Sequence, residues 1–247
     1  MASEKVTALK ERLYRDQVNG DVFFRAIVSD RLESGAYVLD LGCGKGGKET
    51  EFRSEAALVV GCDISQTISM NSSVSTVVRG DANMLPFRSA SFDVVVMDYV
   101  IEHLESPTRC AQETFRVLKS GGYLCLRTPN LYHYVSLVSY MTPHWFHRLV
   151  ANRVRGISGP IEADVIKTYY RANTRHSVEL VFTQAGFVPE QILMVEREPS
   201  YLMFSRPAFL IGYCYERLVN RYECLEHFRS NIFAVMRKPV LNRETTV

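Results

Sequence analysis

The chain has 247 residues, enough for a sizeable buried core in one large α/β domain, with two small domains as the alternative. Its 29 basic and 27 acidic side chains give a formal net charge of +2, with the basic residues scattered along the sequence. This distribution argues against a nucleic acid as the main partner, because binding to a polyanion requires a concentrated basic face. The six cysteines form no CxxC pair, a pattern typical of reduced core residues in a cytoplasmic protein without a secretory segment. No apolar run reaches the roughly 20 residues that an integral membrane segment requires.

Helices and strands are expected to alternate along the first half of the chain. Apolar residues at helical spacing predict two helices within residues 1–34, with Gly20 between them. Five apolar runs then predict strands over residues 36–41, 58–62, 74–79, 92–97 and 123–127. An amphipathic helix over 108–118 is predicted to end at Gly121 and Gly122. This alternation is typical of a parallel sheet with helices on both faces.

The pattern changes after the fifth strand. Residues 130–172 are rich in aromatic side chains and helical in places. A helix over 174–185 stopped by Gly186, a strand over 187–197, an aromatic helical segment over 201–228 and a last strand over 231–237 are predicted to follow. No repeat or linker is evident, so we predict a single domain over residues 1–247 with insertions at 130–172 and 201–228.

The stretch VLDLGCGKGG, residues 38–47, is the most informative part of the sequence. A buried strand here runs into a glycine-rich turn, whose backbone N–H groups can receive an anionic or nucleotide-like ligand. Gly42, Gly44 and Gly47 fit the dinucleotide-binding pattern GxGxxG, while residues 40–46 fit the pattern DxGxGxG of methyltransferases that use S-adenosylmethionine. Asp63 follows Gly42 by 21 positions, where a carboxylate could bind the ribose hydroxyls of either cofactor. The glycine turn therefore leaves the cofactor open.

Two motifs further along the chain favour the methyl donor. They are GDANMLPF over residues 80–87 and SFDVVVMDYVIEHL over residues 91–104. With these motifs the chain resembles the class I S-adenosylmethionine-dependent methyltransferases that act on small molecules, motif by motif over residues 36–128 and elsewhere only in element order. The resemblance implies a Rossmann-like three-layer α/β sandwich, with a seven-stranded, mostly parallel sheet and an antiparallel last strand. The dehydrogenase alternative is weakened because no tyrosine has a lysine four positions later.

The same resemblance implies the contacts of the cofactor, S-adenosyl-L-methionine. Asp40 and the glycine-loop backbone would hold the methionine part, Asp63 would bind the ribose, and Asp81 would accept from the adenine amino group. Ligands of open α/β folds bind at the carboxyl edge of the sheet, which suits these positions. The implied cofactor-binding set is Asp40, Gly42, Cys43, Gly44, Gly46, Asp63, Ile64, Asp81, Ala82, Asp98 and Tyr99.

Methyl transfer from a sulfonium mainly requires alignment of the reactants, and a general base is useful when the acceptor is a hydroxyl. His103, in IEHL, matches a position that this family often fills with histidine, and a loop-ordering role is the alternative. His133, in TPNLYHY after the fifth strand, is the second candidate base. No metal is expected, because His144 and His147 have no third ligand at a fitting spacing.

The aromatic residues of the 130–172 insertion are interpreted as a lid or acceptor wall, with ordinary core packing as the alternative. The substrate candidates are Tyr132, Tyr134, His144, Trp145, Tyr169, Tyr170, Arg127, Asn130 and Arg171. The segment 201–228 could cover the sheet, form a homodimer interface or rest on a membrane. Core or interface packing is favoured, since the segment lacks a lysine-rich polar face.

These observations together predict an enzyme that methylates a small-molecule acceptor, at oxygen, with a histidine as general base. Carbon methylation of a quinone-like or lipid acceptor is the alternative within catalysis. A non-catalytic cofactor-binding protein is the alternative of a different class, and it is disfavoured because every cofactor motif is intact. The sequence does not identify the acceptor.

Overall fold

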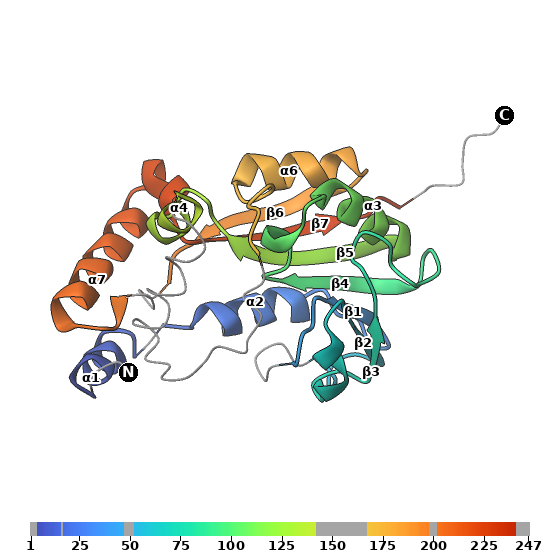
Figure 1. Cartoon of the computed structure of the whole chain (residues 1–247), viewed down its shortest axis with the longest axis horizontal. Helices are drawn as coiled ribbons and strands as arrows, with labels where there is room; N and C mark the ends of the chain where they lie inside the picture. The colour runs from blue at the N-terminus through green and yellow to red at the C-terminus, as the bar shows by residue number, and fades with distance from the viewer. Residues whose placement is uncertain (1–3, 16, 47–51, 142–166, 198–201, 241–247) are drawn as a thin grey trace. The chain divides into compact units, whose positions relative to one another are not determined.

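The computed structural model of the chain describes residues 4–15, 17–46, 52–141, 167–197 and 202–240 (Figure 1). The chain divides into two compact units. Unit 1 consists of Met1–Gly20, Pro129–Lys167 and Met194–Asn231, and unit 2 consists of Asp21–Thr128, Thr168–Leu193 and Ile232–Val247. Most of both predicted insertions thus belongs to unit 1, and the single-domain organisation over residues 1–247 stays a prediction.

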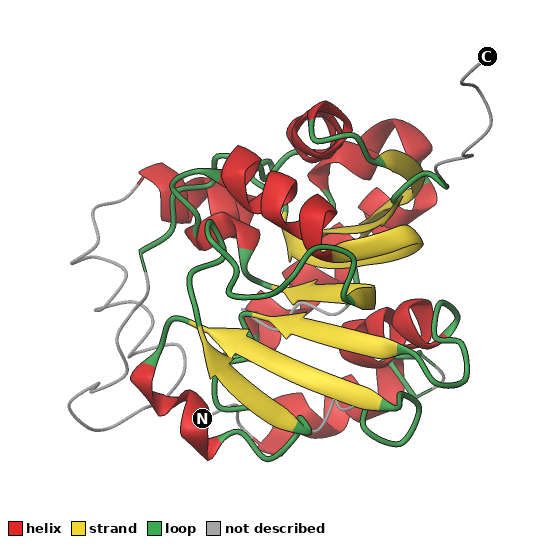
Figure 2. Ribbon diagram, turned by 90° about the vertical axis from the view of Figure 1, so that its right-hand side faces the viewer, coloured by secondary structure: helices red, strands yellow, loops and turns green. Residues whose placement is uncertain are grey.

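A seven-stranded sheet, nearly all of it in unit 2, has the strand order β3-β2-β1-β4-β5-β7-β6 (Figures 1 and 2). Strands β1 to β5 pair in parallel, whereas Lys238 exchanges hydrogen bonds with Gly121 and Gly122 in the antiparallel pairing of β7 with β5. The predicted mostly parallel sheet with an antiparallel last strand is therefore confirmed. The strands are β1 (Tyr37–Leu41), β2 (Leu58–Asp63), β3 (Thr76–Arg79), β4 (Phe92–Asp98), β5 (Leu118–Pro129), β6 (Val188–Val195) and β7 (Asn231–Arg237).

Helices cover both faces of this sheet, which explains the continuous apolar runs of its central strands. Helix α2 (Gly20–Ser29) lies on one face, and its Phe24 ring lies 5.5 Å from the ring of Phe233 in β7. Helices α3 (Pro107–Val117) and α6 (Arg175–Gln184) lie together on the other face (Figure 1). The central residues Leu39 and Val95 are fully buried between these layers. The Rossmann-like three-layer arrangement is confirmed.

The junction between α3 and β5 differs from the prediction. Helix α3 ends at Val117 and β5 begins at the next residue, so the strand is much longer than the predicted 123–127. Gly121 has a φ of 82°, and a Cβ at Gly122 would lie 2.7 Å from the carbonyl oxygen of Asp93. The register between β4 and β5 shifts at this point. The two glycines therefore form an irregularity within a strand and do not stop the helix.

The ends of α6 follow the prediction closely. The Thr174 side chain accepts from the Ser177 N–H at 3.1 Å, and the Ser177 hydroxyl accepts from the Thr174 N–H at 2.9 Å, in a reciprocal capping box. Gly186, with a φ of 102°, follows the helix at the predicted position. Short 3₁₀ segments, η2 (Gln66–Met70) and η3 (Ile101–His103), follow β2 and β4.

Unit 1 has a small core of its own. Its helices are α1 (Glu4–Leu13), α4 (Tyr134–Met141) and α7 (Arg206–Arg221), with the 3₁₀ segment η5 (Glu223–Phe228). Val6, Tyr14 and Phe209 form the buried cluster between α1 and α7. The Tyr14 hydroxyl donates to the carboxylate of Glu216, which is 1% exposed. Across the part of the chain that the structure describes, no helix is long and apolar enough to cross a membrane.

Candidate active site

The loop after β1 has a backbone shape that allows a ligand to approach closely. Gly42, Gly44 and Gly46 have φ values of 77°, 49° and 80°, which favour glycine. A Cβ at Gly42 would lie 2.3 Å from Val100, and a Cβ at Gly46 would lie 2.4 Å from the Asn71 side chain. A Cβ at Gly44 would meet no described atom within 4 Å. The loop is therefore closely packed against neighbouring segments of unit 2 at Gly42 and Gly46, and it is open at Gly44.

Side chains from β2 and the following segment hold this loop in place. The Asp63 carboxylate accepts from the Gly44 N–H at 2.9 Å and from the Ser65 N–H at 2.8 Å. The Asn71 amide donates to the carbonyl oxygen of Cys43 at 3.1 Å. A carboxylate offers about four lone-pair sites, so Asp63 retains capacity for two hydroxyls of a ribose. Burial raises the pKa of the Cys43 thiol to about 12, which fits a packing role for this cysteine.

Three carboxylates influence one another beside the glycine loop. Asp40, at the end of β1, is 6% exposed, and burial followed by the charges of Asp98 and Asp63 raises its pKa to about 7. Such mutual repulsion would be relieved by a cationic ligand. The ammonium and sulfonium of S-adenosylmethionine provide positive charge, so the charge of this site fits the cofactor implied by the motifs.

Arg127 of β5 is occupied by contacts within unit 2. Its Nε donates to Asp98 Oδ1, its Nη2 lies 2.8 Å from Asp98 Oδ2, and its Nη1 lies 2.5 Å from Asp21 Oδ1. The guanidinium lies over the Phe24 ring at 5.2 Å and the Tyr99 ring at 4.7 Å. Because Arg127 is 6% exposed, these contacts favour a role in orienting Asp98 and Tyr99 over the predicted contact with an acceptor.

The residues predicted to bind adenosine follow β2 and β3 at the same edge of the sheet. Ile64 is 67% exposed, so its side chain offers an apolar surface on which a ring could pack. Asp81 is exposed, and its Oδ1 accepts from the Asn83 N–H at 2.8 Å, while Ala82 is half-buried. Tyr99, after β4, is 39% exposed and has a φ of 55°. All predicted cofactor residues thus lie in unit 2, and Gly47 of the alternative dinucleotide pattern lies outside the described residues.

A buried glutamate adjoins the predicted base His103. Glu102 is 3% exposed, and its Oε1 lies 4.0 Å from His103 Nε2. Its Oε2 accepts from the Thr128 hydroxyl at 3.0 Å, and that hydroxyl accepts from the Asn173 amide at 2.7 Å. Burial raises the pKa of Glu102 to about 7 although the hydrogen bond from Thr128 opposes the shift. Glu102 was not predicted as a site residue from the sequence, although an acidic residue within the apolar stretch DYVIEHL was an available signal.

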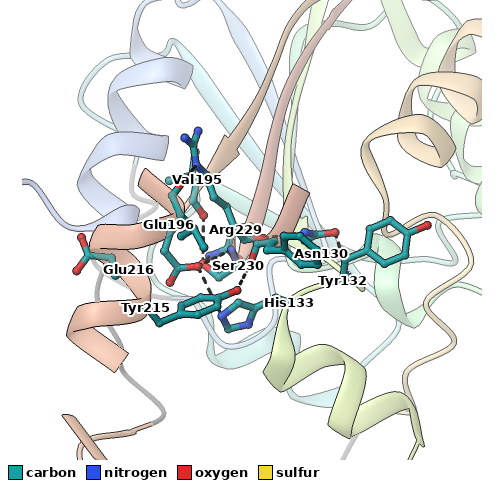
Figure 3. Close-up of polar contacts among 12 residues, drawn as sticks. Asn130, Tyr132, His133, Val195, Glu196, Tyr215, Glu216, Arg229 and Ser230 are labelled. Carbon is teal, nitrogen blue, oxygen red and sulfur yellow. Dashed lines mark hydrogen bonds and ion pairs between the residues drawn. The ribbon is translucent and has the colours of Figure 1, made fainter. Parts of the chain in front are cut away.

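The second predicted base, His133, is enclosed within unit 1 (Figure 3). It is 4% exposed, with its Nε2 3.5 Å from Glu196 Oε2 and its ring 4.2 Å from Tyr134 and 5.7 Å from Tyr215. The Glu196 Oε2 also accepts from the Ser230 N–H at 2.7 Å. Burial lowers the pKa of His133 to about 4 and raises that of Glu196 to about 8. These contacts support a packing role, and a catalytic role for His133 stays a prediction.

The acceptor residues predicted from the aromatic insertion have different environments. In unit 1, Asn130 is fully buried and donates to the carbonyl oxygens of His227 and Arg229 at 2.7 and 2.8 Å, so it joins segments of that unit. Tyr132 is 53% exposed, and Tyr134 is half-buried against His133. The predicted contacts His144 and Trp145 lie outside the described residues.

The remaining acceptor candidates lie in unit 2 beside η3. The Tyr169 N–H donates to the Glu102 carbonyl oxygen at 2.7 Å, and the Tyr169 hydroxyl donates to Glu105 Oε1 at 2.5 Å. The Tyr170 N–H also contacts that carbonyl, at 3.3 Å, and Arg171 Nη1 donates to the Glu105 carbonyl oxygen at 2.5 Å. These contacts fix the segment 169–171 next to Glu102 and His103, where its tyrosines could still contact an acceptor.

Known proteins share both the motifs and the fold. Residues 39–126 match the family model described as a methyltransferase domain. An uncharacterised protein of Methanocaldococcus jannaschii is 24% identical over 74% of each chain, and a demethylmenaquinone methyltransferase of Thermobifida fusca is 33% identical over 38% of this chain and 43% of its own length. A solved S-adenosylmethionine-dependent methyltransferase from Mesorhizobium loti has a TM-score of 0.59 at 16% identity, covering 87% of this chain and 97% of the other.

The fold and the glycine-loop site define a Rossmann-like, nucleotide-binding type of methyltransferase domain. The matched family model spans the glycine loop, β4 and most of β5, which are the elements that build this site. Residues 39–126 thus match a methyltransferase domain, and the surrounding fold is that of S-adenosylmethionine-dependent methyltransferases, which implies S-adenosylmethionine as the cofactor. The chain spans less than half the length of the demethylmenaquinone methyltransferase it matches, so the acceptor is not carried over with the family.

Proposed function

We propose that this protein transfers the methyl group of S-adenosylmethionine to a hydroxyl oxygen of a small-molecule acceptor. The pair Glu102 and His103, directly after β4, carries this proposal. This pair lies in η3, a few residues after Asp98 and Tyr99. Val100, directly before η3, packs against Gly42 of the cofactor loop. The strand order places β4 next to β1, so both segments leave the same edge of the sheet.

The chain's own residues would mainly hold the two reactants in line. S-adenosylmethionine supplies a methyl group on a cationic sulfur that needs no further activation. Asp40 and Asp63 supply negative charge and hydrogen-bond acceptors near the open side of Gly44, while Arg127 fixes the orientation of Asp98. Such alignment and exclusion of water can contribute several kcal/mol to catalysis, on the order of 7 kcal/mol in well-oriented systems.

His103 would take the proton from the acceptor hydroxyl as the new bond to the methyl carbon forms. Its side chain is 27% exposed, so a substrate can reach it, unlike the enclosed His133. The Glu102 carboxylate 4.0 Å away would stabilise the imidazolium that results. A general base of this kind contributes roughly a hundredfold or more to the rate.

Carbon methylation of a quinone-like acceptor is the second candidate. It is supported by the similarity to a demethylmenaquinone methyltransferase, which is 33% identical over the matched region. A phenolic hydroxyl next to the reacting carbon would also lose its proton, so the same histidine could serve both reactions. The two candidates differ in whether the product gains an ether or a carbon-bound methyl group.

Mass spectrometry of a cell extract incubated with the protein and isotopically labelled S-adenosylmethionine tests the proposal. We expect a labelled small molecule, whose fragmentation distinguishes oxygen from carbon methylation. His103→Gln should lower its formation roughly a hundredfold and leave S-adenosylhomocysteine binding unchanged. His176→Gln, at an exposed histidine of α6, is the matched control and should behave as wild type. Equal rates for wild type and His103→Gln would contradict the role of the base.

The same experiment separates an enzyme from a binding protein. Asp63→Ala should abolish both labelling and binding of S-adenosylhomocysteine, since Asp63 contacts the glycine loop and is predicted to bind the ribose. If wild-type protein binds S-adenosylhomocysteine tightly in calorimetry but labels nothing in extracts from several growth conditions, the non-catalytic alternative would be favoured.

A further inference from the structure

Helix α7 of unit 1 has apolar residues on two different faces. Phe209 and Val219 are buried on its inner face. Its outer face exposes Leu210, Ile211 and Leu218, whose exposed fractions are 45%, 68% and 50%. At about 100° per residue these three lie on one stripe, together with the exposed residues Pro207 and Cys214. Core packing, one of the roles predicted for the segment 201–228, therefore explains the buried inner face of α7. It does not explain the exposed apolar residues of the outer face.

Three exposed arginines accompany this outer stripe. Helical spacing places Arg206 and Arg217 along one edge of the stripe, beside Leu210, and places Arg221 within the stripe at the C-terminal end of the helix. The helix sequence RPAFLIGYCYERLVNR contains one acidic residue, Glu216, which is 1% exposed and accepts from the Tyr14 hydroxyl. The exposed surface of α7 thus combines an apolar stripe with three positive charges and no negative charge.

The stability of the helix does not explain these arginines. Arg206 is the first residue of α7, where the helix dipole disfavours a cation. Among the described residues, the side chains of Arg206 and Arg221 make no hydrogen bond or ion pair. Arg217 differs, because its guanidinium lies 4.9 Å from the Tyr213 ring and 6.0 Å from the Tyr14 ring. Arg206 and Arg221 are therefore available to a partner that supplies negative charge.

A second copy of the chain fits this surface poorly. In an antiparallel two-fold pair of α7 helices that meet through this stripe, the first turn of each helix would lie beside the last turn of the other. Arg206 of each copy would then approach Arg221 of the other copy. No exposed carboxylate on α7 could neutralise them, and like charges placed together oppose association. The complementary partner must therefore offer an apolar layer and an array of negative charges side by side.

Helix α4 enlarges the apolar surface of unit 1. The rings of Tyr134 and Tyr215 lie 5.0 Å apart, so the start of α4 packs against α7. Figure 1 shows the two helices as neighbours. Helix α4 has the sequence YVSLVSYM, without a charged residue. Four of its side chains are between 42% and 74% exposed, namely Leu137, Val138, Tyr140 and Met141. An uncharged helix next to an arginine-edged helix is typical of a surface that contacts lipid.

We propose that unit 1 binds the surface of an anionic membrane through α7, with the apolar stripe at the boundary between headgroups and acyl chains and the arginines against lipid phosphates. A helix that lies in the membrane plane requires this combination of an apolar face and flanking cations. The proposal concerns association with a membrane surface and does not depend on the identity of the methyl acceptor.

Vesicle flotation with the full-length protein tests this proposal. The probes are phosphatidylcholine vesicles with and without roughly one-third phosphatidylglycerol, an anionic lipid fraction that attracts basic side chains. We expect binding to the anionic vesicles that weakens at high salt, because the electrostatic part is screened. The double variant Arg206→Gln/Arg221→Gln should bind about thirtyfold more weakly, since each arginine contributes about 1 kcal/mol at such a surface. Ile211→Ser/Leu218→Ser should lose most of the binding.

Matched controls use exposed residues of unit 2. Arg109→Gln on α3 and Leu180→Ser on α6 remove a cation and an exposed leucine elsewhere, and each should float as wild type does. Equal binding to both kinds of vesicle, or equal loss in control and α7 variants, would overturn the proposal. A wild-type dimer in light scattering that Ile211→Ser/Leu218→Ser converts to monomer would also overturn it, in favour of self-association. S-adenosylhomocysteine binding, measured in parallel, keeps this result separate from the methyltransferase activity.

Discussion

Replacing Asp40 by asparagine should stabilise the free protein and weaken cofactor binding at the same time. Burial and the charges of Asp98 and Asp63 disfavour ionisation of Asp40 and raise its pKa in the folded chain from the ordinary 3.8 to about 7. A folded-state pKa above the unfolded value means that the stabilising contribution is fully present below pH 3.8 and is lost as the pH rises to about 7. The difference of about three pKa units corresponds to at most about 4 kcal/mol of unfolding free energy.

Asparagine cannot ionise, so the variant should avoid this loss. At about pH 8 we expect Asp40→Asn without ligand to melt above wild type, and even half of the full difference would raise Tm by roughly 4–8 °C. Near pH 4 the difference in unfolding free energy should shrink to below about 1 kcal/mol, because Asp40 is protonated in the folded state and only partly ionised in the unfolded state. Glu102 and Glu196 also have raised pKa values, so only the difference between variant and wild type isolates Asp40.

Binding of the cofactor should respond in the opposite direction. A cationic ligand favours ionised Asp40, so the Kd of wild type for S-adenosylmethionine should rise up to tenfold per pH unit as the pH falls below about 7. Asp40→Asn should bind weakly at every pH, without this slope. Calorimetry and thermal melting from about pH 5.5 to 8.5 measure both effects on the same samples. A wild-type Kd that is constant with pH, or a slope that persists in Asp40→Asn, would refute the reasoning.

Three further substitutions test other parts of the structure. Gly42→Ala combines a φ of 77° with a Cβ contact of 2.3 Å, so it should lower the free energy of unfolding by about 1–3 kcal/mol. Gly35→Ala is the control, because its φ is 85° but no described atom lies within 4 Å of the new Cβ, and it should cost less. Equal urea midpoints for the two variants would count against the packing argument. Glu102→Gln removes negative charge beside the proposed base His103, so the acidic limb of the pH profile of kcat/KM should move to lower pH. An unshifted limb would show that Glu102 does not stabilise the protonated base. Tyr14→Phe leaves the buried carboxylate of Glu216 without its hydroxyl donor. Urea unfolding should then give an unfolding free energy about 1–3 kcal/mol lower than that of wild type. A change below about 0.5 kcal/mol would show that the carboxylate finds another donor.

The positions of the strands along the chain and the cofactor loop could be predicted from sequence because their signals are local. A short apolar run followed by glycines specifies a buried strand and a turn within about ten residues, whatever lies elsewhere in the chain. The limits of α6 were equally local, since Thr174 caps one end and Gly186 follows the other. The same rule was wrong at Gly121 and Gly122, because the backbone of Asp93 in the neighbouring strand explains these glycines and helix termination does not.

The surroundings of the polar residues were decided by tertiary structure. Arg127, Asn130 and His133 each looked like groups that could face an acceptor, since a sequence shows the type of a side chain but not what lies opposite it. In the folded chain Arg127 pairs with Asp98, and Asn130 binds backbone carbonyls from a segment almost a hundred residues away. Buried polar groups require such partners, because leaving them unsatisfied costs about 1–3 kcal/mol each.

The sequence by itself determined the class of domain, the positions of the strands along the chain and the positions of the cofactor motifs, because these depend on residues close together in the chain. Only the tertiary structure decided that His103 adjoins a buried glutamate while His133 is enclosed, and that one face of α7 remains exposed. The physical reason is that burial, pKa and exposure depend on residues brought together from distant parts of the sequence, whereas strands and glycine turns depend on neighbours.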